Sequence, residues 1–410
     1  MIVIMVLAAL LLRIHVIRAN PPIFPPGWGG EMSSVATAIA GGEGFASPYW
    51  VSTGKTALVP PVYPYLLAFI YQFFGVHTEA SGFAAVYLNA VLSAITTLLI
   101  YLLGKKLFDP WVGLIAGWLW ALYPVTGYAD SVYIWSTSLY TMQLTLILLL
   151  GFTLTRKQAR WIWFGFGLII GITCLTEVLV LLVAPLLLAW ALYGQRTDVR
   201  RIGLVIAAVL IVIVPWTVRN TLVFGQVMFL RSGLGLELNR GLQEDDFATM
   251  TDPIILPNRS SEEFARYVEL GEINYAQEKL NDVVSYAVSH PAEYALRTIR
   301  HFMALWTGNR EIIYLGWYPG SMERRKQVLY SLPAILAAAG LFLSFRVKHP
   351  ARLVFLGLLI LHSGVYYFTP TPPRYRVPIE PELFILSVFA IQYVFLKLEA
   401  RRPRRTVQPT

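Results

Sequence analysis

Residues 1–17, MIVIMVLAALLLRIHVI, begin the chain with an apolar run long enough to cross a bilayer. A membrane-spanning helix needs about 20 mainly apolar residues, or about 17 at the shortest. The run lacks a basic leading segment and a small-residue cleavage site, so we expect a retained transmembrane helix rather than a signal peptide. The composition agrees, because 56% of the 410 residues are hydrophobic and 14% are charged. Soluble domains carry roughly 25% charged residues, so we predict an all-α polytopic membrane protein.

Charge and cysteine content exclude two further classes. The net charge of +9 comes from basic residues spread over many loops rather than gathered on one soluble face, so we predict no nucleic-acid partner. Cys174 is the single cysteine, which excludes an internal disulfide and leaves the redox compartment open.

About ten segments are apolar enough to be membrane-spanning helices. Residues 62–75, VYPYLLAFIYQFFG, are apolar but too short to span. We expect them to form an amphipathic helix at the membrane interface, anchored by tyrosines. The predicted spans are 1–17, 82–103, 111–128, 134–154, 161–177, 178–194, 202–218, 327–345, 352–368 and 379–397.

The distribution of Lys and Arg predicts the orientation of these spans. With a cytoplasmic N-terminus, the inward loops and the C-terminal tail hold clusters of basic residues, as the positive-inside rule requires. Both termini then lie in the cytoplasm, and two long loops, about 18–81 and 219–326, lie outside a plasma membrane. This gives an N-terminal module over 1–218, an extracytoplasmic subdomain over 219–326, and C-terminal helices with a basic tail over 327–410.

The second outer loop has helical signals of its own. Ser260 and Glu263 match a capping box, and the following residues, up to 289, keep a helical period. Pro291 is typical of the first position of another helix. We therefore expect a helical subdomain that rests on the membrane.

Charged residues on the outer face suggest a chemistry. Glu31 lies in a short run of small residues, GGEMSSVATAIAGGEGF, and Arg374 and Arg376 interrupt a proline-rich outer loop. A glycosidase needs two carboxyl groups, whereas a phosphate leaving group is already acidic and needs only cations. One carboxylate can then act as general base, and arginine binds phosphate through paired hydrogen bonds. If this loop is extended, Arg374 and Arg376 project to the same side and meet one phosphate.

Four stretches resemble one enzyme family: GGEMSSVATAIAGGEGF (29–45), PPVYPYLLAFIYQFFG (60–75), VPWTVRNTLVFGQ (214–226) and PRYRVPIEPELF (373–384). Their order is similar to that in the fold-C integral-membrane glycosyltransferases, within them bacterial family 39. Protein O-mannosyltransferases and the aminoarabinose transferase of lipid A are related enzymes. The resemblance implies transfer of a sugar from a polyprenyl-phosphate donor to an acceptor on the outer face of the plasma membrane.

The resemblance also implies roles for single residues. Glu31 takes the place of the acidic residue in the first outer loop, the base that activates the acceptor, although the family more often has Asp there. Asp130 is the candidate for a second acid, and Arg374 and Arg376 for the donor-phosphate site. Apart from membrane lipids, the implied partners are the lipid-linked donor and an unidentified acceptor. We predict no cofactor and no metal site, since the residues lend no support to a divalent metal.

Other interpretations stay open for the same residues. Lys55 fits either an approach to the donor phosphate or simple solvation, and Arg219 fits either that site or a snorkelling side chain at a span end. Glu31 also suits a helix dipole, and the two loop arginines also suit lipid head groups. A transporter or lipid flippase is the competing class, but such proteins carry ionisable residues at mid-membrane depth, and no predicted span has a charge near its centre. A non-catalytic scaffold would not need the loop arginines.

Overall fold

The computed structural model describes residues 1–21, 29–49, 51–154, 157–194, 196–243, 257, 260–308 and 323–400. Within these ranges the chain is built from helices, and its β-pairing is an isolated bridge between Ala46 and Lys55. The predicted all-α polytopic architecture is confirmed.

All ten predicted spans coincide with helical segments. They are α1 (Ile2–Ala19), α4 (Glu79–Leu107), α5 (Pro110–Leu122) with α6 (Pro124–Val132), α7 (Thr137–Thr153), α8 (Arg160–Cys174), α9 (Val180–Ala189) with the π-helical turn Trp190–Gly194, α10 (Val199–Phe224), α14 (Glu323–Arg346), α15 (Arg352–Gly364) and α16 (Glu380–Ala400). Among the described helices, five are long and apolar enough to cross a membrane, or up to six with α5 and α6 taken together. The number of spans therefore stays a prediction.

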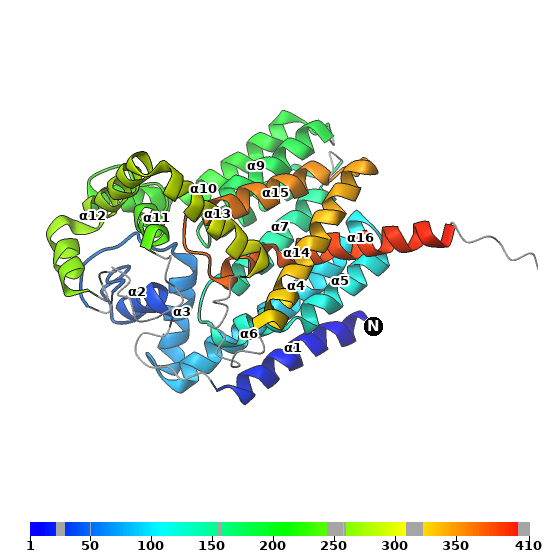
Figure 1. Cartoon of the computed structure of the whole chain (residues 1–410). Helices are drawn as coiled ribbons and strands as arrows, with labels where there is room; N and C mark the ends of the chain where they lie inside the picture. The colour runs from blue at the N-terminus through cyan, green and yellow to red at the C-terminus, as the bar shows by residue number, and fades with distance from the viewer. Residues whose placement is uncertain are drawn as a thin grey trace, which may run out of the picture.

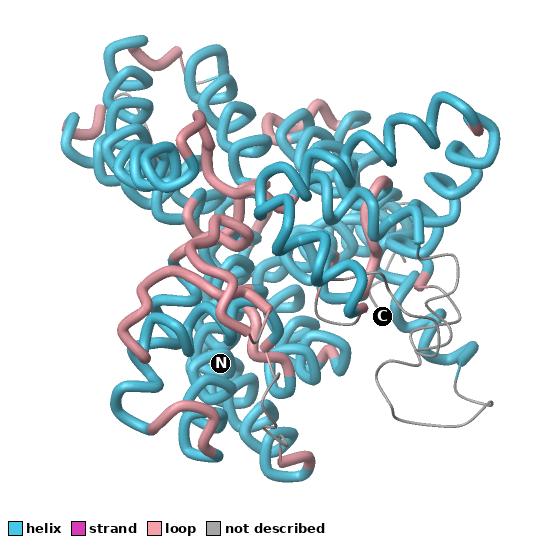
Figure 2. Tube along the Cα trace, turned by 90° about the vertical axis from the view of Figure 1, so that its left-hand side faces the viewer, coloured by secondary structure: helices cyan, strands magenta, loops and turns pink. Residues whose placement is uncertain are grey.

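Most helices outside the predicted spans lie at one end of the molecule, whereas the helix over residues 291–307 runs towards its middle (Figure 1). The first α-helical residue of α1 and the end of α16 lie towards the opposite end. Figure 2 looks onto the end that holds α2 and α12, where loop segments run between the helices. The additional helices are α2 (Gly30–Ala40), α3 (Val62–Phe74), α11 (Leu234–Gln243), α12 (Ser261–Ser289) and α13 (Pro291–Thr307), and three 3₁₀ turns cover Val365–Tyr367, Pro373–Tyr375 and Val377–Ile379.

Glycines allow the long helices to pack closely. A Cβ on Gly104 of α4 would lie 2.6 Å from the Cα of Gly113 of α5, and one on Gly113 would lie 2.3 Å from the carbonyl oxygen of Tyr101. Small residues at such crossings let two helix backbones approach, which favours helix association in a bilayer. Asp109 caps α5 by accepting from Trp111 N–H at 2.7 Å.

Helix α3 has one buried and one exposed face, as predicted, whereas its location at a membrane interface stays a prediction. Tyr63 and Tyr71 are buried among α2 and α4, whereas Tyr65, Phe69 and Phe73 are exposed at intervals of four residues. The exposed stripe is thus mainly phenylalanine, because the tyrosines at 63 and 71 fall on the packed face.

Helix α12 begins where the capping signal places it. The Ser260 hydroxyl accepts from Glu263 N–H at 3.3 Å, and the Glu263 carboxylate binds Lys279 at 2.8 Å. The helix is not continuous, because Gly271 has a φ of 72° and bends it. Pro291 begins α13, as expected.

Candidate active site

The start of α2, just before Glu31, lies against the connection between α6 and α7. Gly29 and Gly30 have left-handed φ values of 93° and 52°, which side-chain-bearing residues rarely adopt. A Cβ on Gly30 would lie 3.0 Å from the Trp135 ring. Glu31 follows in the first helical turn and is half-buried. The sequence Gly-Gly-Glu therefore fits a backbone that turns tightly beside Trp135.

Glu31 also lies close to a buried phenol of the first outer loop. Burial raises the pKa of Tyr49 well above its ordinary value, and the negative charge of Glu31 adds to this rise. Helix α2 itself is fixed by a 2.7 Å hydrogen bond between the hydroxyl groups of Ser33 and Tyr71 of α3. The carboxylate is thus carried by a packed helix rather than by a free loop.

Arg374 contacts the same tryptophan. Its guanidinium carbon lies 4.5 Å from the centroid of a Trp135 ring and 5.4 Å from that of Tyr375. Tyr375 in turn stacks on Tyr366, with ring centroids 4.6 Å apart. The Nε of Arg374 is buried and has no hydrogen-bond partner, and the guanidinium forms no ion pair with a described residue. Trp135 therefore lies next to both Gly30, the residue before Glu31, and Arg374, whose Nε can still donate a hydrogen bond.

Helix α11 brings further charges towards this region. Glu237 lies 3.7 Å from Arg231 and 3.5 Å from Arg240. A Cβ on Gly241 would lie 2.5 Å from the carbonyl oxygen of Phe368, so α11 packs directly on the chain that leads to Arg374. The charges of Glu237 and Arg240 lie near enough to interact with Tyr375. These residues belong to the long loop over residues 219–326, and sequence reasoning did not single them out.

Lys55 belongs to the long loop over residues 18–81, and Arg219 of α10 contacts the same loop. Lys55 is exposed, and its Nζ donates to the Glu43 carbonyl at 2.5 Å. Arg219 donates to the carbonyls of Thr56 at 2.6 Å and Phe45 at 2.9 Å, and its guanidinium lies over Trp216. Arg219 thus holds two strands of this loop against α10.

Glu272 of α12 fixes the same loop from the other side. Its buried carboxylate accepts from Ala57 N–H at 2.8 Å, from the Ser232 hydroxyl at 2.6 Å and from the hydroxyl groups of Thr56 and Tyr267. One carboxylate therefore joins α12 to both the first outer loop and the segment that precedes α11.

Arg376 lies in the protein interior, away from solvent. Its side chain is 0% exposed, with its Nε 2.7 Å from Glu380 and its Nη2 2.6 Å from the Tyr330 carbonyl oxygen. The predicted extended stretch is wrong, because Pro373–Tyr375 and Val377–Ile379 form 3₁₀ turns. Successive residues are then about 120° apart, so the geometric reason for placing both arginines on one phosphate is lost.

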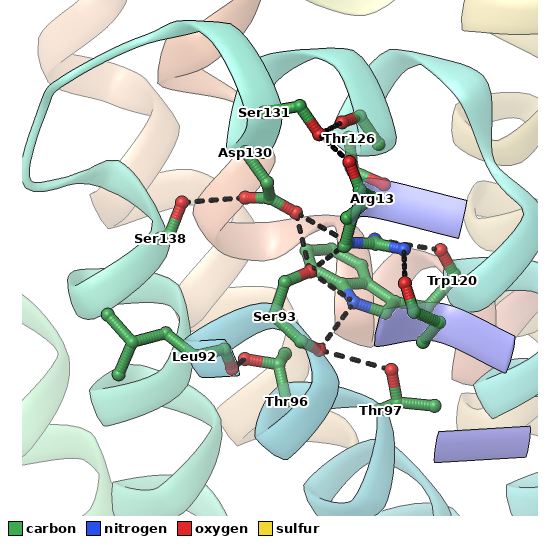
Figure 3. Close-up of polar contacts among 12 residues, drawn as sticks. Arg13, Leu92, Ser93, Thr96, Thr97, Trp120, Thr126, Asp130, Ser131 and Ser138 are labelled. Atoms are coloured by element: carbon green, nitrogen blue, oxygen red, sulfur yellow. Dashed lines mark hydrogen bonds and ion pairs between the residues drawn. The ribbon is translucent and has the colours of Figure 1, made fainter. Parts of the chain in front are cut away.

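Asp130 is also enclosed (Figure 3). It is 1% exposed and forms an ion pair with Arg13 of α1, with Nε and Oδ2 3.1 Å apart. Ser93 donates to the same oxygen, and Ser138 donates to Oδ1 at 2.6 Å. Arg13 occurs in the predicted first span, where sequence reasoning assigned it no partner.

Comparisons with known proteins address the fold. Residues 58–218 match the family described as dolichyl-phosphate-mannose-protein mannosyltransferase. The structure is similar to the archaeal oligosaccharyltransferase AglB from Archaeoglobus fulgidus, with a TM-score of 0.58 and 14% identity over 99% of this chain and 52% of that chain. This is the fold of the fold-C integral-membrane glycosyltransferases. The resemblance expected from the four sequence stretches is confirmed.

Two further solved structures are also similar. An oligosaccharyltransferase from Archaeoglobus fulgidus tethered with an acceptor peptide matches with a TM-score of 0.55 and 16% identity over 98% of this chain and 50% of that chain. ArnT from Cupriavidus metallidurans, bound to undecaprenyl phosphate, matches with a TM-score of 0.43 and 15% identity over 96% of this chain and 77% of that chain. The present chain spans about half the length of the archaeal enzyme. The search of curated protein sequences gave no significant match.

One further carboxylate lies near these charges. Glu177 is half-buried in the turn between α8 and α9, close enough to Arg231 and Glu237 for their charges to interact with it. Among the described residues, no group of three or more His, Cys, Asp or Glu side chains is placed to hold a metal ion.

Proposed function

We propose that this protein transfers a sugar from a polyprenyl-phosphate-linked donor to an acceptor on the outer face of the plasma membrane. The observation that supports this best is the shared contact with Trp135, which the Glu31 helix and Arg374 both approach. The fold-C likeness and the mannosyltransferase match are consistent with it. The archaeal relative was determined in complex with a dolichol-phosphate, which is the class of lipid that this donor would release.

In the proposed reaction, the bond between the sugar's anomeric carbon and the phosphate oxygen breaks. The lipid phosphate leaves with the electron pair, and the acceptor's hydroxyl or amine forms the new bond. Arg374 binds the phosphate and offsets its charge, so no general acid is required. Glu31 takes the acceptor's proton, a contribution of about 10²–10⁴ in rate. Lys55 is the candidate for a second phosphate contact from the first outer loop.

The proposal includes an orientation in the membrane. Positive-inside loops favour cytoplasmic termini, and α12 lies at the end of the molecule away from the start of α1 (Figure 1). We place the site outside the membrane on this basis. No resident metal is included, because Arg374, with Lys55, supplies the positive charge in this proposal, and transfer should persist in the presence of EDTA.

Purified protein in detergent, given radiolabelled polyprenyl-phosphate sugars and membrane extract, should release polyprenyl phosphate and label an acceptor. Glu31→Gln keeps the side-chain volume and removes the base, so turnover should fall by about a hundredfold while donor binding persists. Glu43→Gln, an exposed carboxylate of the same loop, is the control. Full activity in Glu31→Gln with loss in Glu43→Gln would show that the base is misassigned. Transport without transfer across a broad donor panel would overturn the function itself.

A further inference from the structure

The break between α5 and α6 leaves backbone carbonyl groups without their helical partners. In a continuous helix the Trp120 carbonyl would accept from the N–H of residue 124, but that residue is Pro124, which has none. The two helices meet at 54°. The nearest backbone donor, Tyr123 N–H, lies at a long 3.4 Å from the Trp120 oxygen. A helix end inside a membrane protein needs another donor for these groups.

Arg13 of α1 supplies that donor (Figure 3). Its Nη2 lies 3.3 Å from the Trp120 oxygen, and its Nη1 lies 3.1 Å from the Ala121 oxygen. A cation is also favoured at a helix C-terminus, where the backbone dipoles leave partial negative charge. The guanidinium therefore caps α5 at its broken end. Its own charge is balanced by Asp130 in the last turn of α6.

Asp130 then closes the connection that follows. Its Oδ1 accepts from Ser138 at the start of α7, so one hydrogen bond of 2.6 Å joins the two ends of the segment that carries Trp135. Asn89 holds the same segment by donating to the Tyr133 carbonyl at 2.9 Å. Trp135 is the residue that both Gly30 and Arg374 contact.

We infer that Arg13 and Asp130 are positioning residues, which hold the broken helix and thereby place Trp135 between the Glu31 helix and Arg374. The effect of this positioning on the reaction rests on the proposed function, whereas the positioning itself does not. Both oxygens of Asp130 are already occupied by Arg13, Ser93 and Ser138. That occupancy favours positioning over the role of a second catalytic acid.

The test separates position from activity. The 12 tryptophans are replaced by 5-fluorotryptophan, and the Trp135 fluorine resonance is assigned by its absence in Trp135→Phe. Asp130→Asn removes the negative charge that balances Arg13. Ser138→Ala removes the hydrogen bond to Asp130 Oδ1 and leaves the ion pair between Arg13 and Asp130 in place. The Ser138→Ala variant therefore remains informative if Asp130→Asn does not fold. Both should shift the Trp135 resonance. Ser344→Ala, a buried serine of α14 whose hydroxyl donates within its own helix, is the matched control and should not.

Misplacement of reacting groups by about 1 Å can lower rates by about a hundredfold, so kcat/KM should fall at least about tenfold in Asp130→Asn. An unchanged Trp135 resonance in both variants would overturn the inference. A shifted resonance with kcat/KM unchanged would overturn the link to the reaction. If the unaltered protein transfers no sugar, the proposed function fails, and the resonance alone still decides whether Arg13 and Asp130 position Trp135.

Discussion

Arg374 and Arg376 are two residues apart, and the structure predicts opposite consequences for replacing them. Arg376→Met removes the partner of a carboxylate that is 0% exposed, Glu380, whose second oxygen already has no hydrogen-bond partner. It also deprives the Tyr330 carbonyl of a 2.6 Å hydrogen bond. Removing one member of a buried ion pair lowers the free energy of unfolding by about 3–5 kcal/mol.

Arg374→Ala removes a half-exposed side chain whose described contacts are aromatic rings, Trp135 and Tyr375. Cation–π contacts of this kind stabilise by about 0.5–1 kcal/mol when exposed and about 2 kcal/mol when desolvated. The fold should therefore persist. The guanidinium is the proposed phosphate ligand, so donor binding should weaken about tenfold or more, and Arg374→Lys should weaken it less because charge remains without the paired geometry.

The assay compares equilibrium unfolding in mixed detergent micelles with binding of a polyprenyl-phosphate sugar. Arg376→Met/Glu380→Gln is the matched control, because neutralising the orphaned carboxylate should recover part of the stability lost in Arg376→Met. The reasoning is refuted if Arg374→Ala unfolds as readily as Arg376→Met. It is also refuted if Arg376→Met keeps full stability and loses donor binding, since the roles would then be reversed.

Two further predictions concern residues of the two long loops, over residues 18–81 and 219–326. Glu272→Ala should lower the free energy of unfolding by about 2–5 kcal/mol, because it leaves the buried Ala57 N–H and neighbouring hydroxyl groups without an acceptor. Glu269→Ala, on the exposed face of the same helix, should change the free energy of unfolding little. Equal unfolding curves for the two variants would contradict the prediction. Gly30→Ala should be more harmful to stability and transfer than Gly42→Ala. Both glycines have positive φ, but a Cβ at Gly42 meets nothing within 4 Å whereas one at Gly30 meets Trp135; equal losses would show that the contact is unimportant.

The sequence predicted most of the helices because their signals are local. An apolar segment of membrane-spanning length, a serine cap or a proline at the first helical turn acts on its own neighbours. The same local patterns did not reveal the break at Pro124, since apolar residues flank it on both sides and the predicted span runs through it to residue 128. The carbonyl oxygens left at the break accept hydrogen bonds from Arg13, 108 residues away from Ala121 in the chain. No periodicity in either segment encodes that pairing.

The candidate site was predictable in part for a similar reason. Glu31 lies at a helix start that its own glycines define, so the sequence indicated its local position, whereas its place on the outer face stays a prediction. Trp135 carries no charge and lies in a short connection, so chemistry alone gave no reason to choose it. Its importance follows from contacts with Gly30 and Arg374, which only the folded chain brings to one ring.

The roles of Arg374 and Arg376 could be assigned only once the folded structure showed which partners each side chain has. Proline fixes φ near −65°, a value shared by extended polyproline and 3₁₀ backbones. The prolines around residues 372–378 therefore restrict the loop but do not determine which of the two conformations it adopts. The loop forms 3₁₀ turns on both sides of Arg376, and since successive residues of such a turn are about 120° apart, residues 374 and 376 do not project to the same side. Arg376 thereby reaches Glu380 and backbone carbonyls in the interior, while Arg374 keeps a buried Nε without a partner beside Trp135. A cation whose donors are satisfied by the protein has little left for a substrate. Arg374, whose Nε has no hydrogen-bond partner among the described residues, is therefore the arginine expected to bind phosphate.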